Sequence, residues 1–335
     1  MIIPRLQLVT QSWVRLHKPH TQKFGYSPKL CPKAHPTCAS GGREEKVELL
    51  DHNEVYQAFL RQVEAHTVDE RLATNHWRQR CIEIRENART ENPFDFLRWP
   101  SLTDFSVPES WIPRKFYDDL RSSPEWASRW FPLTRENKLG NPKDFSPDFG
   151  TSPILVQHAS HLQRYEAATG GSIIDCDVVF EIGGGYGSFC RVLRNSGFTG
   201  VHVIYDLPHI SSIQRLYLAL SGLTEVSSDG ISKRDEHRFC LITDDNLDDV
   251  FGILRSSRLR TAFVATWSLS ETPMSVRDRI FPRFLPVCDR YLIAFQPAWE
   301  TISNVDYFAA LPSARPDLNW RDEAIPPTTS RYLFA

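Results

Sequence analysis

Several features that would assign this chain at once to a class are missing from its sequence. No apolar run reaches about 18 residues, the length of a membrane-spanning helix, so we expect no membrane segment. The net charge of −2 at pH 7 is too small to favour nucleic acid as an obligate partner. The seven cysteines include no Cys-x-x-Cys pair, and their odd number and scattered positions indicate reduced thiols in a cytoplasmic protein.

Acidic residues are absent from the first 43 positions, although seven Lys or Arg occur there. Such a basic start is typical of a transit peptide, but a disordered tail or a start codon placed too early would look the same. Its proline, histidine and serine content favours a poorly ordered tail over residues 1–43. Cys31, His35 and Cys38 lie in this tail without an evident fourth ligand, so we expect no metal site there.

Residues 44–150 are predicted to form a cap region. Apolar residues recur at helical spacing up to position 89 and predict two helices that break near Thr67 and act as packing elements or as a dimer face. Nine of the 23 prolines and four of the nine tryptophans fall between positions 91 and 153. This proline content argues against long regular structure, and the aromatic content is too high for disorder. We therefore expect an ordered, loop-rich segment that covers the domain beyond it.

The clearest motif is DVVFEIGGGYGSF, from Asp177 to Phe189. It predicts a buried strand, Val178–Ile182, that runs through a glycine turn into a helix. Glycine permits unusual dihedral angles and a close approach of ligand, and the helix start offers free N–H groups to a carboxylate or phosphate. The dinucleotide fingerprint G-x-G-x-x-G is broken by Ser188, which stands where the third glycine should be. The stretch instead fits acid-x-G-x-G-x-G throughout, from Glu181 to Gly187.

That pattern resembles motif I of the class I S-adenosylmethionine (SAM)-dependent methyltransferases. Together with YDLPHI at 205–210 and TWSLSE at 266–271, it resembles a family of sugar O-methyltransferases over residues 150–335, and only loosely before them. The resemblance implies a Rossmann-like α/β fold in residues 151–335, with seven mostly parallel strands and a C-terminal antiparallel hairpin. It also implies that SAM is the cofactor, held by Glu181 and by a loop made of Gly183, Gly184, Gly185, Tyr186 and Gly187.

Polar residues follow the next two predicted strands. Asp206 follows the strand Val201–Tyr205, at a position where a carboxylate can bind both hydroxyls of a ribose. Leu207 would pack against the adenine ring. The resemblance assigns the adenine amino group to Asp244, with Asp245 close behind, after the strand at 239–242. Helix capping is the alternative role for both aspartates.

The fourth predicted strand, Thr261–Trp267, leads into Ser268, Ser270 and Glu271. In open α/β sheets, ligands bind beyond the carboxyl ends of the strands, near the point where the strand order reverses. We therefore expect Trp267 to contact the cofactor and the two serines to contact substrate. Gln296, which ends the fifth strand, and Asp306 are further substrate candidates.

The base that takes the acceptor proton is not fixed by any motif. No histidine occurs after His237, which excludes the late histidine base of many plant-type O-methyltransferases. Glu271 and Asp306 remain, as do His158 and His161 on a helix that begins at Ser152-Pro153 and ends at Gly170. We rank Glu271 first and His158 second, and a packing role is the alternative for each.

The sequence therefore predicts a SAM-dependent O-methyltransferase that acts on a hydroxyl of a sugar or glycosylated metabolite. A non-sugar hydroxyl is the alternative acceptor. An NAD(P)-dependent oxidoreductase and a non-catalytic binding protein with this fold are alternatives from other classes. We expect a cytoplasmic enzyme with a small-molecule partner and without metal, nucleic acid or membrane, and a homodimer is one option.

Overall fold

A computed structural model describes residues 52–106, 111–145, 150–233, 237–326 and 328–335. All of them belong to one unit, Leu49–Ala335. The tail expected over residues 1–43 lies outside the described residues. The proposed division between a cap region and a second domain at residue 150 stays a prediction.

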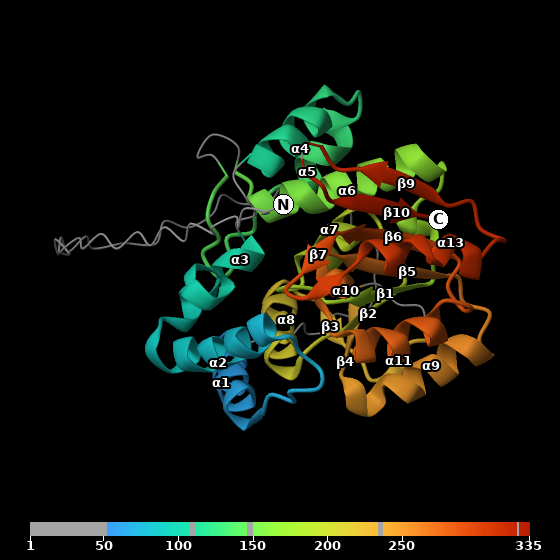
Figure 1. The fold of residues 1–335 in the computed structure, drawn as a ribbon. Helices are drawn as coiled ribbons and strands as arrows, with labels where there is room; N and C mark the ends of the chain where they lie inside the picture. Colours follow the sequence, from blue (N-terminus) through green and yellow to red (C-terminus); the bar gives the residue numbers. More distant parts are fainter. Residues whose placement is uncertain (1–51, 107–110, 146–149, 234–236, 327) are drawn as a thin grey trace, which may run out of the picture. The chain divides into compact units, whose positions relative to one another are not determined.

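An eight-stranded sheet organises the chain, in the order β3-β4-β2-β1-β5-β6-β10-β9 (Figure 1). Its strands are β1 Val178–Ile182, β2 Val201–Tyr205, β3 Thr224–Glu225, β4 Arg238–Ile242, β5 Thr261–Thr266, β6 Arg290–Phe295, β9 Arg321–Ala324 and β10 Arg331–Phe334. The strands from β3 to β6 in this order are parallel, whereas β10 is antiparallel to both β6 and β9. The predicted α/β fold with a mostly parallel sheet and a C-terminal hairpin is confirmed. The additional strand β3 has two exposed residues, too few to give an apolar pattern in the sequence.

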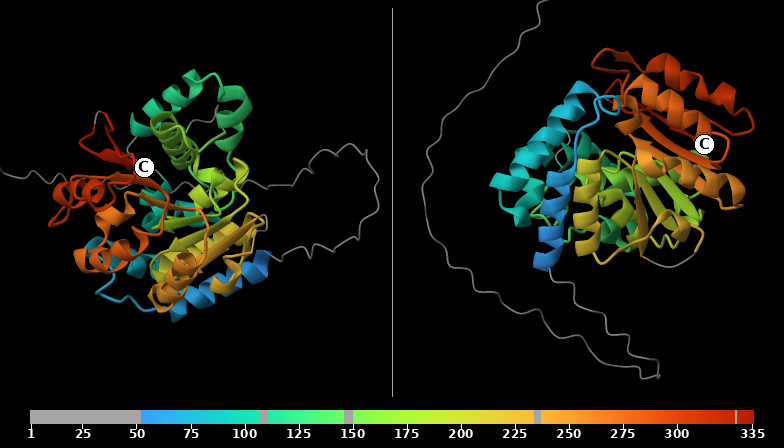
Figure 2. Two further views of the ribbon diagram at one scale, coloured as in Figure 1. Left: turned by 90° about the vertical axis from the view of Figure 1, so that its right-hand side faces the viewer. Right: turned by 90° about the horizontal axis from the view of Figure 1, so that it is seen from below.

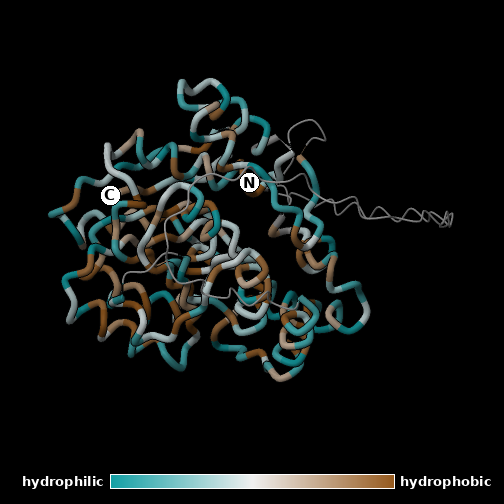
Figure 3. The backbone as a smooth tube through the Cα atoms, turned by 180° about the vertical axis from the view of Figure 1, so that it is seen from behind, coloured by the Kyte–Doolittle hydropathy of each residue, from teal (hydrophilic) through white to brown (hydrophobic). Residues whose placement is uncertain are grey.

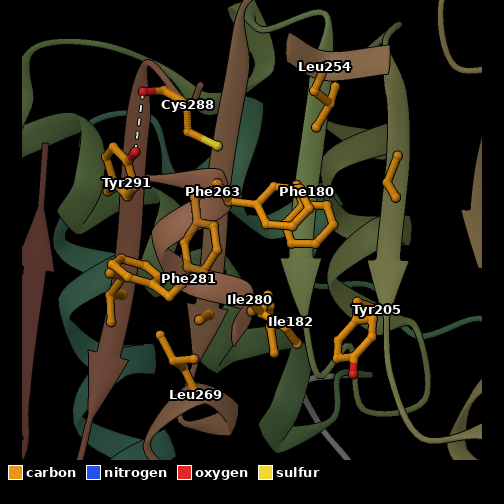
Figure 4. Close-up of a cluster of buried hydrophobic side chains, with 14 of the residues drawn as sticks. Phe180, Ile182, Tyr205, Leu254, Phe263, Leu269, Ile280, Phe281, Cys288 and Tyr291 are labelled. Atoms are coloured by element: carbon orange, nitrogen blue, oxygen red, sulfur yellow. Dashed lines mark hydrogen bonds between the residues drawn. The ribbon is translucent and has the colours of Figure 1, made fainter. Parts of the chain in front are cut away.

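Helices cover both faces of the sheet, which is why its central strands are buried throughout. On one face lie α9 Leu247–Ser256 and α11 Met274–Phe284. There Phe180 of β1, Phe263 of β5 and Phe281 of α11 form an aromatic cluster (Figure 4), with the Phe263 and Phe281 ring centroids 5.0 Å apart. On the other face lie α6 Pro153–Thr169, α7 Ser188–Asn195 and α8 Pro208–Leu220.

The two helices expected near the start of the described chain are present. They are α1 His52–Ala65 and α2 Asn75–Thr90, so the predicted break near Thr67 is confirmed. Phe59 and Val63 of α1 pack against α8, which runs beside it (Figure 2). Polar and apolar stretches alternate along the outer helices (Figure 3), as expected for helices with one buried face. Among the described residues, no helix is both long enough and apolar enough to cross a membrane.

The segment between α2 and α6 is more helical than expected. It contains η1 Pro93–Arg98, η2 Pro100–Leu102, α3 Thr103–Ser106, α4 Trp111–Ser122, a π-helical turn η3 Trp126–Trp130 and α5 Phe131–Leu133. Pro93, Pro100 and Pro132 each lie at the start of a helical turn, and Pro113 lies in the first turn of α4. Proline is tolerated in a first turn because its missing N–H would have no acceptor within the helix. These four prolines therefore mark helix starts rather than loops, whereas Pro124 and Pro142 lie in a turn and a loop.

Short elements complete the fold. They are η4 Ile173–Asp175, η5 Ser228–Gly230, η6 Asp244–Asn246, α10 Ser268–Glu271, α12 Val305–Ala309, α13 Leu311–Ala314 and a separate two-stranded sheet of β7 Ala298–Trp299 and β8 Ile302–Ser303.

The strand order reverses at β1, because the chain builds outward to β2 on one side and later to β5 on the other. The carboxyl ends of β1, β2, β4, β5 and β6 therefore meet on one edge, where α10 follows β5 and β7 follows β6.

Candidate active site

The glycine loop between β1 and α7 has a backbone that only glycine adopts easily. Gly183, Gly185 and Gly187 have φ angles of 71°, 55° and 95°, all in the left-handed region. A Cβ atom on Gly183 would lie 2.2 Å from Ser268 Cβ, and one on Gly184 would lie 2.7 Å from Ile204 Cγ2. The loop therefore packs against β2 and α10 without room for a side chain, directly before the free N–H groups that begin α7.

Glu181 lies below this loop as one half of a buried pair. A hydrogen bond of 2.8 Å joins its Oε2 to Nε2 of His202, and both side chains are almost completely buried. Burial raises the pKa of Glu181 well above its usual range. The sequence analysis missed His202, because its pairing follows from strand register. His202 of β2 lies opposite Val179 of β1, which places it on the same face as Glu181.

Asp206 follows β2 and is held against the glycine loop. Its Oδ1 accepts from the backbone N–H of Leu207 at 2.8 Å, and its Oδ2 accepts from Gln214 Nε2 at 2.6 Å. Burial raises the pKa of Asp206 to about 7. Gln214 of α8, which the sequence did not single out, also donates to the Gly185 carbonyl at 3.0 Å. Leu207 is partly buried and packs against the apolar residues around α8.

Asp244 pairs with groups of the protein, and its expected contact with adenine stays a prediction. Its Oδ2 accepts from Arg279 Nη1 of α11 at 2.8 Å, and its Oδ1 accepts from the Tyr205 hydroxyl at 3.0 Å. This ion pair fastens the end of β4 to α11, so we assign Asp244 a structural role. The alternative of helix capping is met instead by Asn246, whose Oδ1 accepts from the Thr243 N–H at 2.8 Å. Asp245 is exposed at the same turn.

Two further candidate residues, Tyr186 and Ser268, make contacts within the protein that support the glycine loop. The Tyr186 side chain is buried, with its ring centroid 4.8 Å from that of Tyr217, so it belongs to the core rather than to a ligand surface. Ser268 donates its hydroxyl hydrogen bond to the Ile182 carbonyl, which ties α10 to the end of β1. The expected roles of Tyr186 as a cofactor contact and of Ser268 as a substrate contact stay predictions.

Trp267, between β5 and α10, has a strained backbone. Its φ of 73° and ψ of −41° are unusual for a residue with a side chain, and its N–H donates to the Ala294 carbonyl at 2.7 Å. Such a conformation costs about 1–3 kcal/mol and is found most often at functional sites. Its partly buried ring lies 6.4 Å from the His161 ring, centroid to centroid.

Glu271 is held by two donors from distant parts of the chain. Its Oε1 accepts from Gln296 Nε2, and its Oε2 accepts from Trp77 Nε1, each at 3.0 Å. The hydroxyl of Ser270, itself buried, lies 2.8 Å from Gln296 Oε1. The structure therefore brings Ser270, Glu271 and Gln296 together as one network, to which α2 adds Trp77.

A buried arginine fixes the backbone behind this network. Arg277 of α11 is fully buried and donates to the Ser270 carbonyl and to Asn304 Oδ1, each at 2.6 Å. Asn304 in turn donates to the Gln296 carbonyl at 2.9 Å. Burial lowers the pKa of Arg277 to about 10. Asn304 therefore has a structural role, and neither residue had been predicted to support Glu271.

The other candidate bases lie elsewhere. His158 is buried, with Nδ1 3.2 Å from the Ser188 hydroxyl, and burial lowers its pKa to about 3. His161 is buried beside the Tyr332 hydroxyl at 2.7 Å, and burial lowers its pKa well below the usual value. Both histidines pack in the core, which favours the packing role that was the alternative for each, and the ranking of His158 as the second candidate base stays a prediction. Asp306 is exposed in the first turn of α12, outside the network around Glu271.

Aromatic residues of the predicted cap region lie over the glycine loop. A Cβ on Gly185 would lie 3.6 Å from Cδ1 of Phe105 in α3, and the Phe105 and Trp77 ring centroids are 5.1 Å apart. The start of α2 is anchored at the same edge. The His76 N–H donates to Glu300 Oε1 at 2.9 Å, and Trp299 Nε1 lies 3.4 Å from the Thr74 hydroxyl.

Comparison with known proteins gives only a remote likeness. No protein-family model matches the sequence, and no curated protein matches it. An O-methyltransferase family protein from Burkholderia thailandensis is 10% identical, over 67% of this chain and 68% of its own, with a TM-score of 0.35. The O-methyltransferase of neocarzinostatin biosynthesis is 12% identical, over 77% of this chain and 68% of its own, with a TM-score of 0.32. Human N-acetylserotonin methyltransferase is 10% identical, over 76% of this chain and 70% of its own, with a TM-score of 0.32. Because these TM-scores are low, the functional proposal rests on this chain alone.

Proposed function

We propose that this protein is a SAM-dependent O-methyltransferase that methylates a hydroxyl of a small molecule. The glycine loop supports this proposal most directly. Three left-handed glycines connect a buried acid, Glu181, to the start of α7, at the point where the strand order reverses. That is the place where open α/β sheets bind ligands. The intact acid-x-G-x-G-x-G pattern, with Ser188 in place of a third fingerprint glycine, favours SAM over a dinucleotide.

The residues around the loop fit SAM. At Gly185, where Phe105 Cδ1 lies 3.6 Å from the position of a Cβ, a ligand can approach the backbone of the loop closely. Asp206 stands beside it with a carboxylate that can accept from ribose hydroxyls, and the exposed Asp245 is available to an adenine amino group. Leu207 and Trp267, both partly buried, offer apolar surface to the cofactor.

Glu271 is the group that we assign to proton removal. SAM, when bound, supplies an electrophilic methyl group on a sulfonium, so the protein's main task is to position the acceptor. An alcohol does not ionise at neutral pH, and a base must take its proton as the new bond forms. Glu271 is a carboxylate at the sheet edge, fixed by Gln296 and Trp77.

We favour a sugar or glycosylated metabolite as the acceptor. A hollow of about 540 Å³ opens at the start of α2, next to Trp77 in the sequence. It is lined by Asn75, His76, Gln79, Arg80, Glu83, Trp299 and Glu300. Aromatic rings can pack on the apolar face of a sugar, while amide, guanidinium and carboxylate groups bind its hydroxyls. Methylation assays on matched glycosides and aglycones test this choice, and turnover of the aglycones alone would contradict it.

Calorimetric titration with SAM and S-adenosylhomocysteine, beside NADH and NADPH, tests the cofactor. We expect both SAM and its product to bind and neither nicotinamide cofactor to do so. Gly185→Arg should abolish binding, because its φ of 55° disfavours a side chain and Phe105 already lies 3.6 Å from the position of a Cβ. Binding of NADH instead, or no binding to a folded protein, would overturn the proposal.

SAM binding should depend on the protonation of Asp206. Because burial raises its pKa to about 7, this carboxyl is half protonated near neutral pH. Accepting from two ribose hydroxyls requires the charged form, so bound SAM favours deprotonation. We therefore expect constant affinity above pH 7 and a loss of up to about tenfold for each pH unit below it. Calorimetry from pH 6 to 8 measures this trend, and Asp206→Asn should bind weakly without it.

A further inference from the structure

The contact between Trp77 and Glu271 joins residues that are 194 positions apart. Trp77 lies in the first turn of α2, whereas Glu271 ends α10. The indole Nε1 donates to Glu271 Oε2 at 3.0 Å, and the Trp77 ring rests on Phe105, which covers Gly185. The predicted cap region therefore supplies a donor to the carboxylate at the edge of the sheet.

Two contacts fix the start of α2 directly before Trp77. One residue after α2 begins, the His76 N–H is bound by Glu300, and the residue before the helix, Thr74, contacts Trp299. The Thr74 side chain does not cap the helix, so Glu300 supplies the anion at its start from another part of the chain. These contacts fix the backbone directly before Trp77, and Phe105 packs against its ring, so the indole N–H is held toward Glu271.

We infer that Trp77 is a positioning residue that holds Glu271 in the orientation needed to accept a proton from the acceptor hydroxyl. This inference rests on the proposed function of Glu271. Gln296 holds the other carboxylate oxygen, so the two donors together fix the plane of the carboxyl group. A hydrogen bond to a carboxylate also stabilises its charged form relative to its neutral form.

Other charged groups near Glu271 must be kept constant in any test. Arg277 on α11 interacts electrostatically with Glu271, and neighbouring elements carry His76 on α2 and Glu300 after β7. Trp77→Phe removes the indole N–H while leaving these groups, and it keeps an aromatic ring against Phe105. The variant therefore isolates the hydrogen bond from the packing.

The experiment measures the pH dependence of methyl transfer by wild type and Trp77→Phe. We expect the acid limb of kcat to move up by about one pH unit, since the carboxylate loses a donor. The plateau kcat should fall about tenfold, while the KM for SAM stays unchanged. In a Glu271→Gln background, Trp77→Phe should cause no further change. A loss of stability with an unshifted acid limb, or additive losses in the double variant, would overturn the inference.

A spectroscopic measurement separates this inference from the proposed function. The indole Nε1–H resonance of Trp77, assigned by its absence in Trp77→Phe, should shift with pH in the wild type as Glu271 titrates. It should not do so in Glu271→Gln. If the resonance titrates but SAM does not bind, the contact exists and the proposed function fails. If SAM binds and methyl transfer occurs but the resonance is insensitive to Glu271, the positioning role fails alone.

Discussion

Gly183→Ala is expected to destabilise the protein by about 2–5 kcal/mol and to abolish SAM binding. Alanine at a φ of 71° costs about 1–2 kcal/mol. The added Cβ would also lie 2.2 Å from Ser268 Cβ, so α10 must move away from β1. That movement carries Ser270 and Glu271 with it, because both belong to α10. Denaturant unfolding measures the free energy, and calorimetry measures SAM affinity.

Gly170→Ala is the matched control for this substitution. Gly170 ends α6 with a φ of 69°, and nothing lies within 4 Å of the position that its Cβ would occupy. It therefore reports the backbone cost alone, about 1–2 kcal/mol, and SAM affinity should be retained. Equal destabilisation of the two variants, with SAM bound by both, would mean that the contact between Gly183 and Ser268 is not needed for the site.

Glu271→Gln is expected to slow methyl transfer by about 100-fold to 10,000-fold, the usual contribution of a general base. Glutamine has nearly the same shape, and its single carbonyl oxygen can still accept from either Gln296 or Trp77, but it cannot take a proton. SAM affinity should be unchanged, because Asp206 and the glycine loop are untouched. Single-turnover kinetics with saturating SAM measures the chemical step separately from product release.

Asp278→Asn serves as the control for this loss of charge, since Asp278 is exposed on α11 and has no proposed role in the site. Its rate should match that of the wild type. Asp306→Asn tests the alternative base and should also retain most of the rate, because Asp306 lies exposed on α12. A larger loss for Asp306→Asn than for Glu271→Gln would transfer the role of base to Asp306.

The sequence predicted the sheet well because its central strands are short apolar runs bounded by glycine or acidic residues. Val178–Ile182 and Val201–Tyr205 have the same bounds in the structure as in the sequence pattern. Parallel strands with both faces covered are near-continuous apolar runs, so their limits are visible without an alignment even though these two contain Glu181 and His202. The place of the glycine loop and the residues after each strand follow from the same pattern.

The direction in which each polar side chain points could not be predicted. Asp244 faces Arg279, Ser268 faces the end of β1, and Tyr186 faces the core, although all three occupy positions where ligand contacts were expected. The partners of Glu181 and Glu271, His202 and Trp77, depend on strand register and on a contact 194 residues apart. Neither of these two pairings leaves a periodic pattern in the sequence from which it could be predicted.

The anchoring of α2 by Glu300 has a consequence for the order in which the chain folds. During synthesis, α2 leaves the ribosome long before residue 300, so its first turn lacks its anion until most of the chain has emerged. The same holds for Trp77, whose partner is Glu271. Contacts between residues this far apart form late, since they require closure of a long loop. The start of α2 therefore reaches its final arrangement only after β6 and the residues up to Glu300 have been made.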